Sequence, residues 1–280
     1  MRAETFEPFR GHLMAVAYRM LGSVAGAEDV VQETWVRWAS AEGVDAPRAW
    51  LTTVCTRLCL DELRSARARR EEHVGPWLPE PWVDDGPPDD GPLGRSLSVA
   101  FLLLLEALNP RERAAFLLRE VFDEDYAHIA EVLSATEPTV RQWVRRAKQA
   151  IDADRPRFDA DPVAQEALLA AFGAACASGD LATLEALLTD DVIATGDGGG
   201  RAIAAPRPLP GPSAVARFLL GVLRKAPAGL ATEVRWINGQ PGLLLRLDGR
   251  VTGAITLGGR DGRVARYWYV SDPWKLARIR

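Results

Sequence analysis

A segment rich in proline, glycine and acidic residues, spanning 71–96, constrains the fold of this chain more than any other feature. It contains six prolines, four glycines and seven acidic residues. This composition disfavours helix and strand and favours extended, solvated backbone. We therefore predict that residues 71–96 form a linker between folded domains. The chain of 280 residues is long enough for two or three such domains.

The linker also carries apolar side chains that could attach it to a folded surface. Trp77, Leu78 and Trp82 alternate with prolines, a pattern that favours a short polyproline-like segment. Two interpretations follow. The segment docks on a neighbouring domain, or it is a flexible tether whose aromatic residues are incidental.

Residues 4–70, before the linker, have the periodicity of helices. One mostly apolar stripe recurs at helical spacing, and it consists of Ala27, Val30, Val31, Thr34, Trp35 and Trp38. A second, long helix is expected from Arg48 toward Arg70; it is apolar at first and rich in arginine at its end. That basic end either contacts phosphates or is a solvated helix terminus.

Residues 123–151 contain two helical patterns separated by a very short break, which predicts a helix-turn-helix. In the second pattern Val140, Val144, Ala147 and Ile151 return to one side. The adjacent side carries cationic and amide residues suited to phosphates and base edges. A surface helix of any kind would also be charged, but its pairing with the preceding helix favours nucleic-acid binding. The predicted contact residues are Thr139, Arg141, Gln142, Arg145, Arg146 and Lys148.

The pattern changes again after residue 161, where helices are followed by strands. Helices are expected at 165–177, 181–188 and 211–223, and strands at 230–238, 241–247, 250–257 and 263–270. Asn-Gly and Asp-Gly pairs separate the strands, as in hairpins. This order predicts an α+β domain with a curved antiparallel sheet.

The cysteine and hydropathy patterns suggest neither a metal site nor a membrane anchor. Cys55, Cys59 and Cys176 have no CxxC spacing and no histidine cluster nearby, so buried thiols are expected; a redox pair of Cys55 and Cys59 is the less favoured alternative. No stretch reads as a signal peptide or membrane span. We expect a soluble, cytoplasmic protein with no cofactor and no membrane contact.

Several blocks resemble a known family. DVVQETWVRW (29–38) and PRAWLTTVCTRLCLDELRSARAR (47–69) resemble region 2 of extracytoplasmic-function (ECF) sigma factors of the sigma-70 family, and 97–151 resembles their region 4. GPWLPEP (75–81), DGGGRAIAAPRPLPGPSAVARFL (197–219) and NGQPGL (238–243) resemble the sigma-J-type sub-family, which has a C-terminal SnoaL-like domain.

The resemblance implies a fold and a domain order. Two all-α sigma domains, at 1–70 and 97–160, would flank the linker at 71–96. A cone-shaped α+β domain related to nuclear transport factor 2, with an apolar pocket that could hold a small-molecule ligand, would follow at 161–280.

The resemblance also implies binding roles. Asp29, Gln32, Glu33 and Arg37 would bind core RNA polymerase at the clamp helices of its largest subunit, with a further contact to the beta flap. The loop 40–47 and the helix after it would read the melted −10 element, although this loop has no basic or aromatic residue. The −10 contacts would come from Trp50, Arg57, Arg64 and Arg67. The 137–150 helix would read the −35 element. Interdomain regulation would involve Trp77, Leu78, Pro79, Glu80, Pro81, Asp197, Gly198, Gly199, Gly200, Asn238, Gly239, Pro241 and Gly242.

The function that follows is that of an alternative sigma factor, with no catalytic residues, whose activity its own C-terminal domain modulates. Two other classes of protein stay open. One is a helix-turn-helix regulator with a ligand-sensing domain, which leaves 29–70 without a role. The other is a SnoaL-like enzyme with Asp197 as general base; a turn aspartate is the favoured interpretation, because three glycines follow it.

Overall fold

The computed structural model describes residues 2–71, 73–84, 86, 97–154, 158 and 161–279, without the side chains of residues 2, 3 and 65–71. The chain forms two compact units. The first comprises Met1–Glu72, Asp90–Leu97 and Phe101–Arg155, and the second comprises His73–Asp89, Ser98–Ala100 and Pro156–Arg280. The described part of the linker thus belongs to the second unit. The predicted domain boundaries at 70, 96 and 160 stay predictions.

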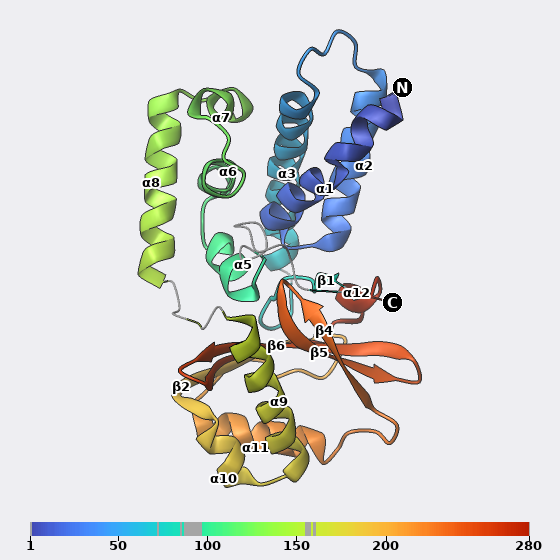
Figure 1. Ribbon diagram of the computed structural model, residues 1–280, viewed down its shortest axis with the longest axis vertical. Coiled ribbons are helices and arrows are strands. Elements are labelled where there is room, and N and C mark those ends of the chain that lie inside the picture. The colour runs from blue at the N-terminus through green and yellow to red at the C-terminus, as the bar shows by residue number, and fades with distance from the viewer. Residues whose placement is uncertain are drawn as a thin grey trace. The chain divides into compact units, whose positions relative to one another are not determined.

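The N-terminal part of the first unit is helical, as predicted. It consists of α1 (Arg2–Leu21), α2 (Val24–Ser40) and α3 (Pro47–Glu71) (Figure 1). Helix α2 begins where it does because the side chain of Ser23 accepts a hydrogen bond from the backbone N–H of Gly26. Most of the predicted apolar stripe of α2 is buried, including Val31 and Trp38.

The rest of the first unit contains the predicted helix-turn-helix, formed by α7 (Tyr126–Leu133) and α8 (Glu137–Asp154). Ser134 ends α7 in the left-handed conformation, at φ 50°. Asn109-Pro110 in the sequence predicts the start of one helix that runs through Arg119. The structure instead has α6 (Pro110–Phe116) followed by a π-helix, η1 (Leu117–Val121).

Contacts between these helices join the two parts of the first unit. Arg113 on α6 is almost fully buried, and its Nη1 donates to the carbonyl of Met20 at the end of α1 at 2.6 Å. It also pairs with Glu106 at 3.1 Å. The ring of Phe122, beyond η1, packs edge-on against His12 of α1. The short helix α5 (Val99–Glu106) precedes α6.

The second unit is an α+β domain. Its helices are α9 (Pro162–Ser178), α10 (Leu181–Ala186), α11 (Pro212–Leu223) and α12 (Pro273–Leu276). Its strands are β1 (Val83–Asp84), β2 (Leu188–Asp197), β3 (Leu209–Pro210), β4 (Ala231–Ile237), β5 (Gln240–Leu247), β6 (Arg250–Arg260) and β7 (Arg263–Val270). They form one sheet in the order β1-β4-β5-β6-β7-β2-β3.

The structure of this unit corrects four predictions. The sheet is mixed rather than antiparallel, because β2 runs parallel to β7. Strand β2 occupies a stretch for which no strand was expected, and the helix expected to reach residue 188 ends at Ala186. The linker was expected to disfavour strands, yet its Val83 and Asp84 pair with Ile237 and Trp236 of β4.

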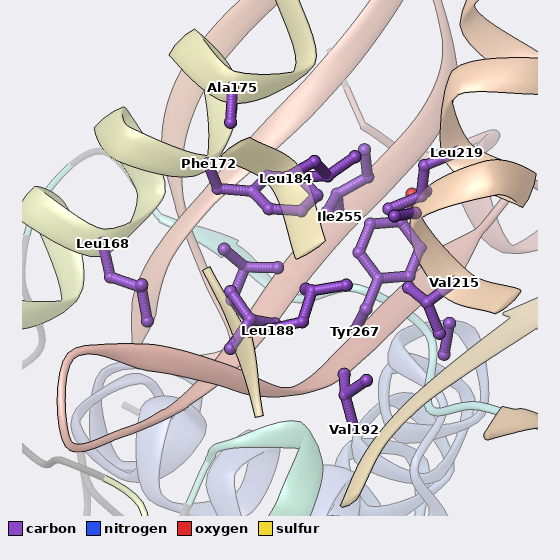
Figure 2. Close-up of a cluster of buried hydrophobic side chains, with 14 of the residues drawn as sticks. Leu168, Phe172, Ala175, Leu184, Leu188, Val192, Val215, Leu219, Ile255 and Tyr267 are labelled. Atoms are coloured by element: carbon purple, nitrogen blue, oxygen red, sulfur yellow. The ribbon is translucent and has the colours of Figure 1, made fainter. Parts of the chain in front are cut away.

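The core of this domain lies between the helices α9, α10 and α11 and one face of the sheet. Phe172, Leu184 and Tyr267 meet in its centre, with Leu188, Val215 and Leu219 around them (Figure 2). The apolar pocket that the resemblance implied for this domain stays a prediction. Among the described residues, none of the helices combines the length and apolarity that crossing a bilayer requires.

Candidate functional site

The predicted polymerase-binding residues share the outer face of α2. Asp29, Gln32, Glu33 and Arg37 are all exposed, and Arg37 pairs with Glu33 at 2.9 Å one turn away. The same face carries the apolar Val36, whose exposed fraction is 54 %. The structure therefore brings these residues together as an acidic and amide surface around one apolar side chain.

The predicted −10 contacts of α3 are not all on one free surface. Trp50 is half-buried, and its ring packs against Trp38 at 5.6 Å between ring centres. Arg64 pairs with Asp61 on an exposed face. Arg57 is exposed, but its guanidinium donates to the carbonyls of Glu131 and Val132, at 2.8 and 3.0 Å, at the end of α7. The side chain of Arg67 lies outside the described residues.

An open cleft lies beside the loop 41–46, between it and the residues that follow η1. Its volume is about 380 Å³, and Phe9, Arg48 and Glu124 contribute to its lining. Arg48 reaches Glu124 at 3.5 Å. The loop itself has no basic or aromatic side chain, whereas the lining of the cleft includes Phe9 and Arg48. Sequence reasoning singled out neither residue.

The predicted recognition residues of α8 are exposed, apart from the half-buried Thr139. They divide into two groups. Lys148 and Arg146 turn toward acidic side chains of the same unit, Glu120 at 2.7 Å and Glu112 at 3.8 Å. The ion pair with Glu120 raises the pKa of Lys148.

Nearer the start of α8, Arg141 lies over the ring of Tyr126, with 4.0 Å from its guanidinium carbon to the ring centre. Thr139 shares a hydrogen bond with the hydroxyl of Thr136. Gln142 and Arg145 complete the exposed basic and amide surface.

The linker is bound to the second unit through Asp197 at the end of β2. Asp197 is fully buried. Its Oδ2 accepts hydrogen bonds from the backbone N–H of Leu78, at 2.8 Å, and from Nζ of Lys275, at 2.6 Å. Its Oδ1 accepts one from the backbone N–H of Gly199 at 3.0 Å and lies 2.9 Å from Nε2 of His73. Linker, sheet and C-terminal helix thus meet at one carboxylate.

Lys275, which was not singled out from sequence, joins the linker from the other side. Its Nζ also donates to the carbonyl of Leu78 and lies 4.7 Å from the ring centre of Trp77. Leu78 is almost fully buried, and Pro79, Glu80 and Pro81 are buried beside it. Of the two interpretations, the docked linker applies to the described residues 73–84.

The glycines after Asp197 allow this arrangement. Gly199 has φ 57°, and a Cβ there would stand 2.1 Å from Oδ2 of Asp272. Gly198 is buried and Gly200 exposed in the same turn. Asp272 in turn pairs with Arg201 at 3.2 Å. His73, Arg201, Asp272 and Lys275 all belong to the site, and sequence reasoning missed them.

The turn at Asn238 and Gly239 holds the linker farther along. Both residues have positive φ, 54° and 71°, which gives the tight turn between β4 and β5. The backbone N–H of Asn238 donates to the carbonyl of Trp82 at 2.7 Å, next to the short strand β1. Pro241 and Gly242 are buried in β5, and a Cβ on Gly242 would stand 2.6 Å from the carbonyl oxygen of Ile255.

The three cysteines behave as packing residues. Cys55 and Cys59 are fully buried in α3, and Cys176 is half-buried in α9. Burial raises the pKa of Cys59 and raises that of Cys176 to about 11. Within the described ranges, His, Cys, Asp and Glu side chains form no cluster that could hold a metal ion.

Comparisons with known proteins agree with this architecture. Residues 5–69 match the model of Sigma-70 region 2, and residues 98–151 match that of Sigma-70, region 4. The ECF RNA polymerase sigma factor SigJ of Mycobacterium tuberculosis is 42% identical over 99% of this chain and 93% of its own length. The probable ECF RNA polymerase sigma factor SigI of the same species is 30% identical over 97% of this chain and 93% of its own.

A solved structure extends the likeness to the whole fold. The crystal structure of the M. tuberculosis extracytoplasmic function sigma factor SigJ covers 98% of both chains with a TM-score of 0.79 and 38% identity. The helical first unit and the α+β second unit therefore occur together in a solved relative. The chain belongs to the extracytoplasmic-function RNA polymerase sigma factors of the sigma-70 family.

Proposed function

We propose that this protein acts in the cytoplasm as a subunit of RNA polymerase that selects promoters, and that its second unit regulates it through the docked linker. The observation that carries the regulatory part is the buried Asp197, which binds the linker at Leu78 and the C-terminal helix at Lys275. The linker joins the two sigma regions in sequence. A domain that fixes part of it restricts how far those regions can separate.

The outer face of α2 is the proposed surface for core polymerase. Its acidic and amide residues suit a basic partner, and the exposed Val36 adds apolar surface that a partner could cover. Replacing Asp29 with arginine should weaken binding to core polymerase by at least tenfold in a fluorescence titration. Asp190, an exposed acid of the second unit, is the matched control when changed in the same way. If both variants bind equally well, core polymerase binds a surface other than the outer face of α2.

The two DNA-reading parts would act on different forms of the promoter. Helix α8 presents a basic and amide face that fits the major groove of duplex DNA at the −35 element. The start of α3, with Trp50, and the cleft beside it, with Phe9 and Arg48, suit the unstacked bases of the melted −10 element. The clamp helices and the beta flap are the polymerase elements proposed to receive the two sigma regions.

We assign Asp197 a structural role rather than that of a general base. Both of its carboxylate oxygens already have two partners from the same chain. A base acting on a substrate needs a free oxygen that faces a cavity. Catalysis therefore forms no part of the proposal, and a ligand of the C-terminal domain stays a prediction.

Run-off transcription on a promoter library, with bacterial core polymerase and with or without this protein, tests the proposal. Specific start sites should appear only when the protein is present. The regulatory part requires that a protein lacking residues 165–280 change promoter output relative to the full chain, and equal output would contradict it. DNA binding without any transcripts, from both proteins, would favour the helix-turn-helix regulator instead.

A further inference from the structure

The basic residues of α8 differ in the contacts that hold their side chains. Arg141 contacts two neighbouring groups and still faces outward. Its guanidinium carbon lies 4.0 Å from the centre of the Tyr126 ring. Its Nη2 donates to Oε2 of Glu137, one turn earlier, at 3.1 Å. The side chain nevertheless keeps an exposed fraction of 57 %. The ring and the Glu137 carboxylate thus hold the guanidinium from two sides.

Tyr126 is itself fixed. It is the first residue of α7, directly after the cap Asp125, whose side chain accepts a hydrogen bond from the backbone N–H of His128 at 2.7 Å. The guanidinium of Arg119 also lies over its ring, 5.0 Å from the ring centre. A tyrosine held by the first helix of the motif thus sets the direction of an arginine on the second.

An arginine whose position is set in advance suits bidentate recognition. A guanidinium has five N–H donors in a rigid fork, and Glu137 accepts from only one of its nitrogens. The fork that is left matches the N7 and O6 acceptors of guanine in the major groove, and residues near the start of a recognition helix are those that reach base edges. A free arginine would lose rotamer freedom on binding, whereas a stacked one has already lost part of it.

We propose that Arg141 reads a guanine of the −35 element and that Tyr126 and Glu137 are positioning residues for it. This inference rests on the proposed function, in which α8 enters the major groove. Lys148 and Arg146 pair with Glu120 and Glu112. In this proposal they serve phosphates rather than bases.

The test is transcription by the complete holoenzyme from a library in which the upstream duplex element is randomised, with sequencing of the transcribed templates. The wild-type protein should select guanine strongly at one or more positions. Arg141→Ala should abolish the preference at one of them alone. Arg141→Lys should do the same, because lysine keeps the charge but lacks the planar fork.

The positioning role is tested at that same position. Tyr126→Leu should lower the guanine preference there about two- to fivefold, the value of one exposed cation–π contact, and should leave other positions unchanged. Tyr126→Phe, which keeps the ring, is the matched control and should retain the preference. If Tyr126→Leu fails to fold in a thermal melt, Glu137→Gln provides the same test from the other contact.

The outcomes distinguish failure of the proposed function from failure of the roles proposed for Arg141, Tyr126 and Glu137. If the wild-type holoenzyme selects no sequence, the proposed function fails, and the inference fails with it. If selection is normal but Arg141→Ala changes no position, or changes all of them equally, Arg141 does not read a base. If Arg141→Ala abolishes one position while Tyr126→Leu and Glu137→Gln leave it intact, the positioning role is refuted.

Discussion

Removal of the Asp197 carboxylate should release the linker from the second unit. In an Asp197→Ala variant, Nζ of Lys275 loses its carboxylate partner while only 14 % of its side chain is exposed. The backbone N–H of buried Leu78 loses its acceptor at the same time. A fully folded variant would therefore contain a charge and a donor that are both poorly solvated.

The magnitude follows from the burial of this pair. Breaking a buried ion pair by removing one partner costs about 3–5 kcal/mol. Lys275 keeps the carbonyl of Leu78 and the ring of Trp77, so we expect the lower end, about 3 kcal/mol. The matched control is Asp191→Ala. Asp191 pairs with Arg260, but both side chains are well exposed, and such pairs contribute about 0–1 kcal/mol.

Hydrogen exchange measured by mass spectrometry reports this change locally. A loss of about 3 kcal/mol should speed exchange of the peptide covering residues 74–84 by about a hundredfold, because local opening sets its protection. In the Asp191→Ala protein the same peptide should exchange as in the wild type. If the two variants protect the linker equally, the Asp197 contacts do not hold it, and the proposed route of regulation loses its basis.

Three further predictions concern side chains packed inside one or the other unit. Arg113→Ala should lower the free energy of unfolding by about 3 kcal/mol in urea titrations, because the buried carbonyl of Met20 loses its donor; a change below about 1 kcal/mol would refute this. Burial, with the charge of Arg48, lowers the pKa of His12 from 6.5 to about 4. As the pH falls, His12 is therefore protonated in the unfolded chain before it is protonated in the folded chain. Stability should then fall by about 2 kcal/mol as the pH drops from about 6.5 to about 4, and His12→Gln should remove this part of the profile. Cys176, with its pKa raised to about 11, should react with iodoacetamide at pH 8 about a hundredfold more slowly in the native than in the unfolded protein, and equal rates would contradict its burial.

Features that depend on neighbours in sequence were predictable. The helix-turn-helix follows from apolar spacing and from a turn that Ser134 can adopt. The turns at Asn238-Gly239 and at Asp248-Gly249 follow from residue types that accept positive φ, and the strands around them fall within a few residues of the prediction. In each case the determining contacts lie within a few positions along the chain.

The features that were missed depend on partners far away in sequence. Strand β2 includes the acidic pair Asp190 and Asp191, which breaks its alternation of apolar and polar residues. Its parallel partner β7 is far away in the sequence. Lys275 is a single lysine near the C-terminus, and nothing around it points to Asp197, 78 positions earlier. Sequence singled out Asp197 as a candidate general base, as a turn aspartate before three glycines and as part of a block resembling the sigma-J-type sub-family, and the structure shows what its carboxylate binds.

Arg57 shows how such distant contacts change what a predicted DNA-binding residue contributes. Its guanidinium donates to the carbonyls of Glu131 and Val132, which lie at the partly negative C-terminal end of α7. A phosphate could accept these hydrogen bonds only after Arg57 has broken those to the carbonyls. The contribution of Arg57 to the free energy of DNA binding is therefore the phosphate contact less the carbonyl contacts that are lost. Arg64, whose partner Asp61 is solvent-exposed, gives up less. For equal phosphate contacts, Arg64 should therefore contribute more to DNA affinity than Arg57, and any DNA contact by Arg57 must loosen α3 from α7.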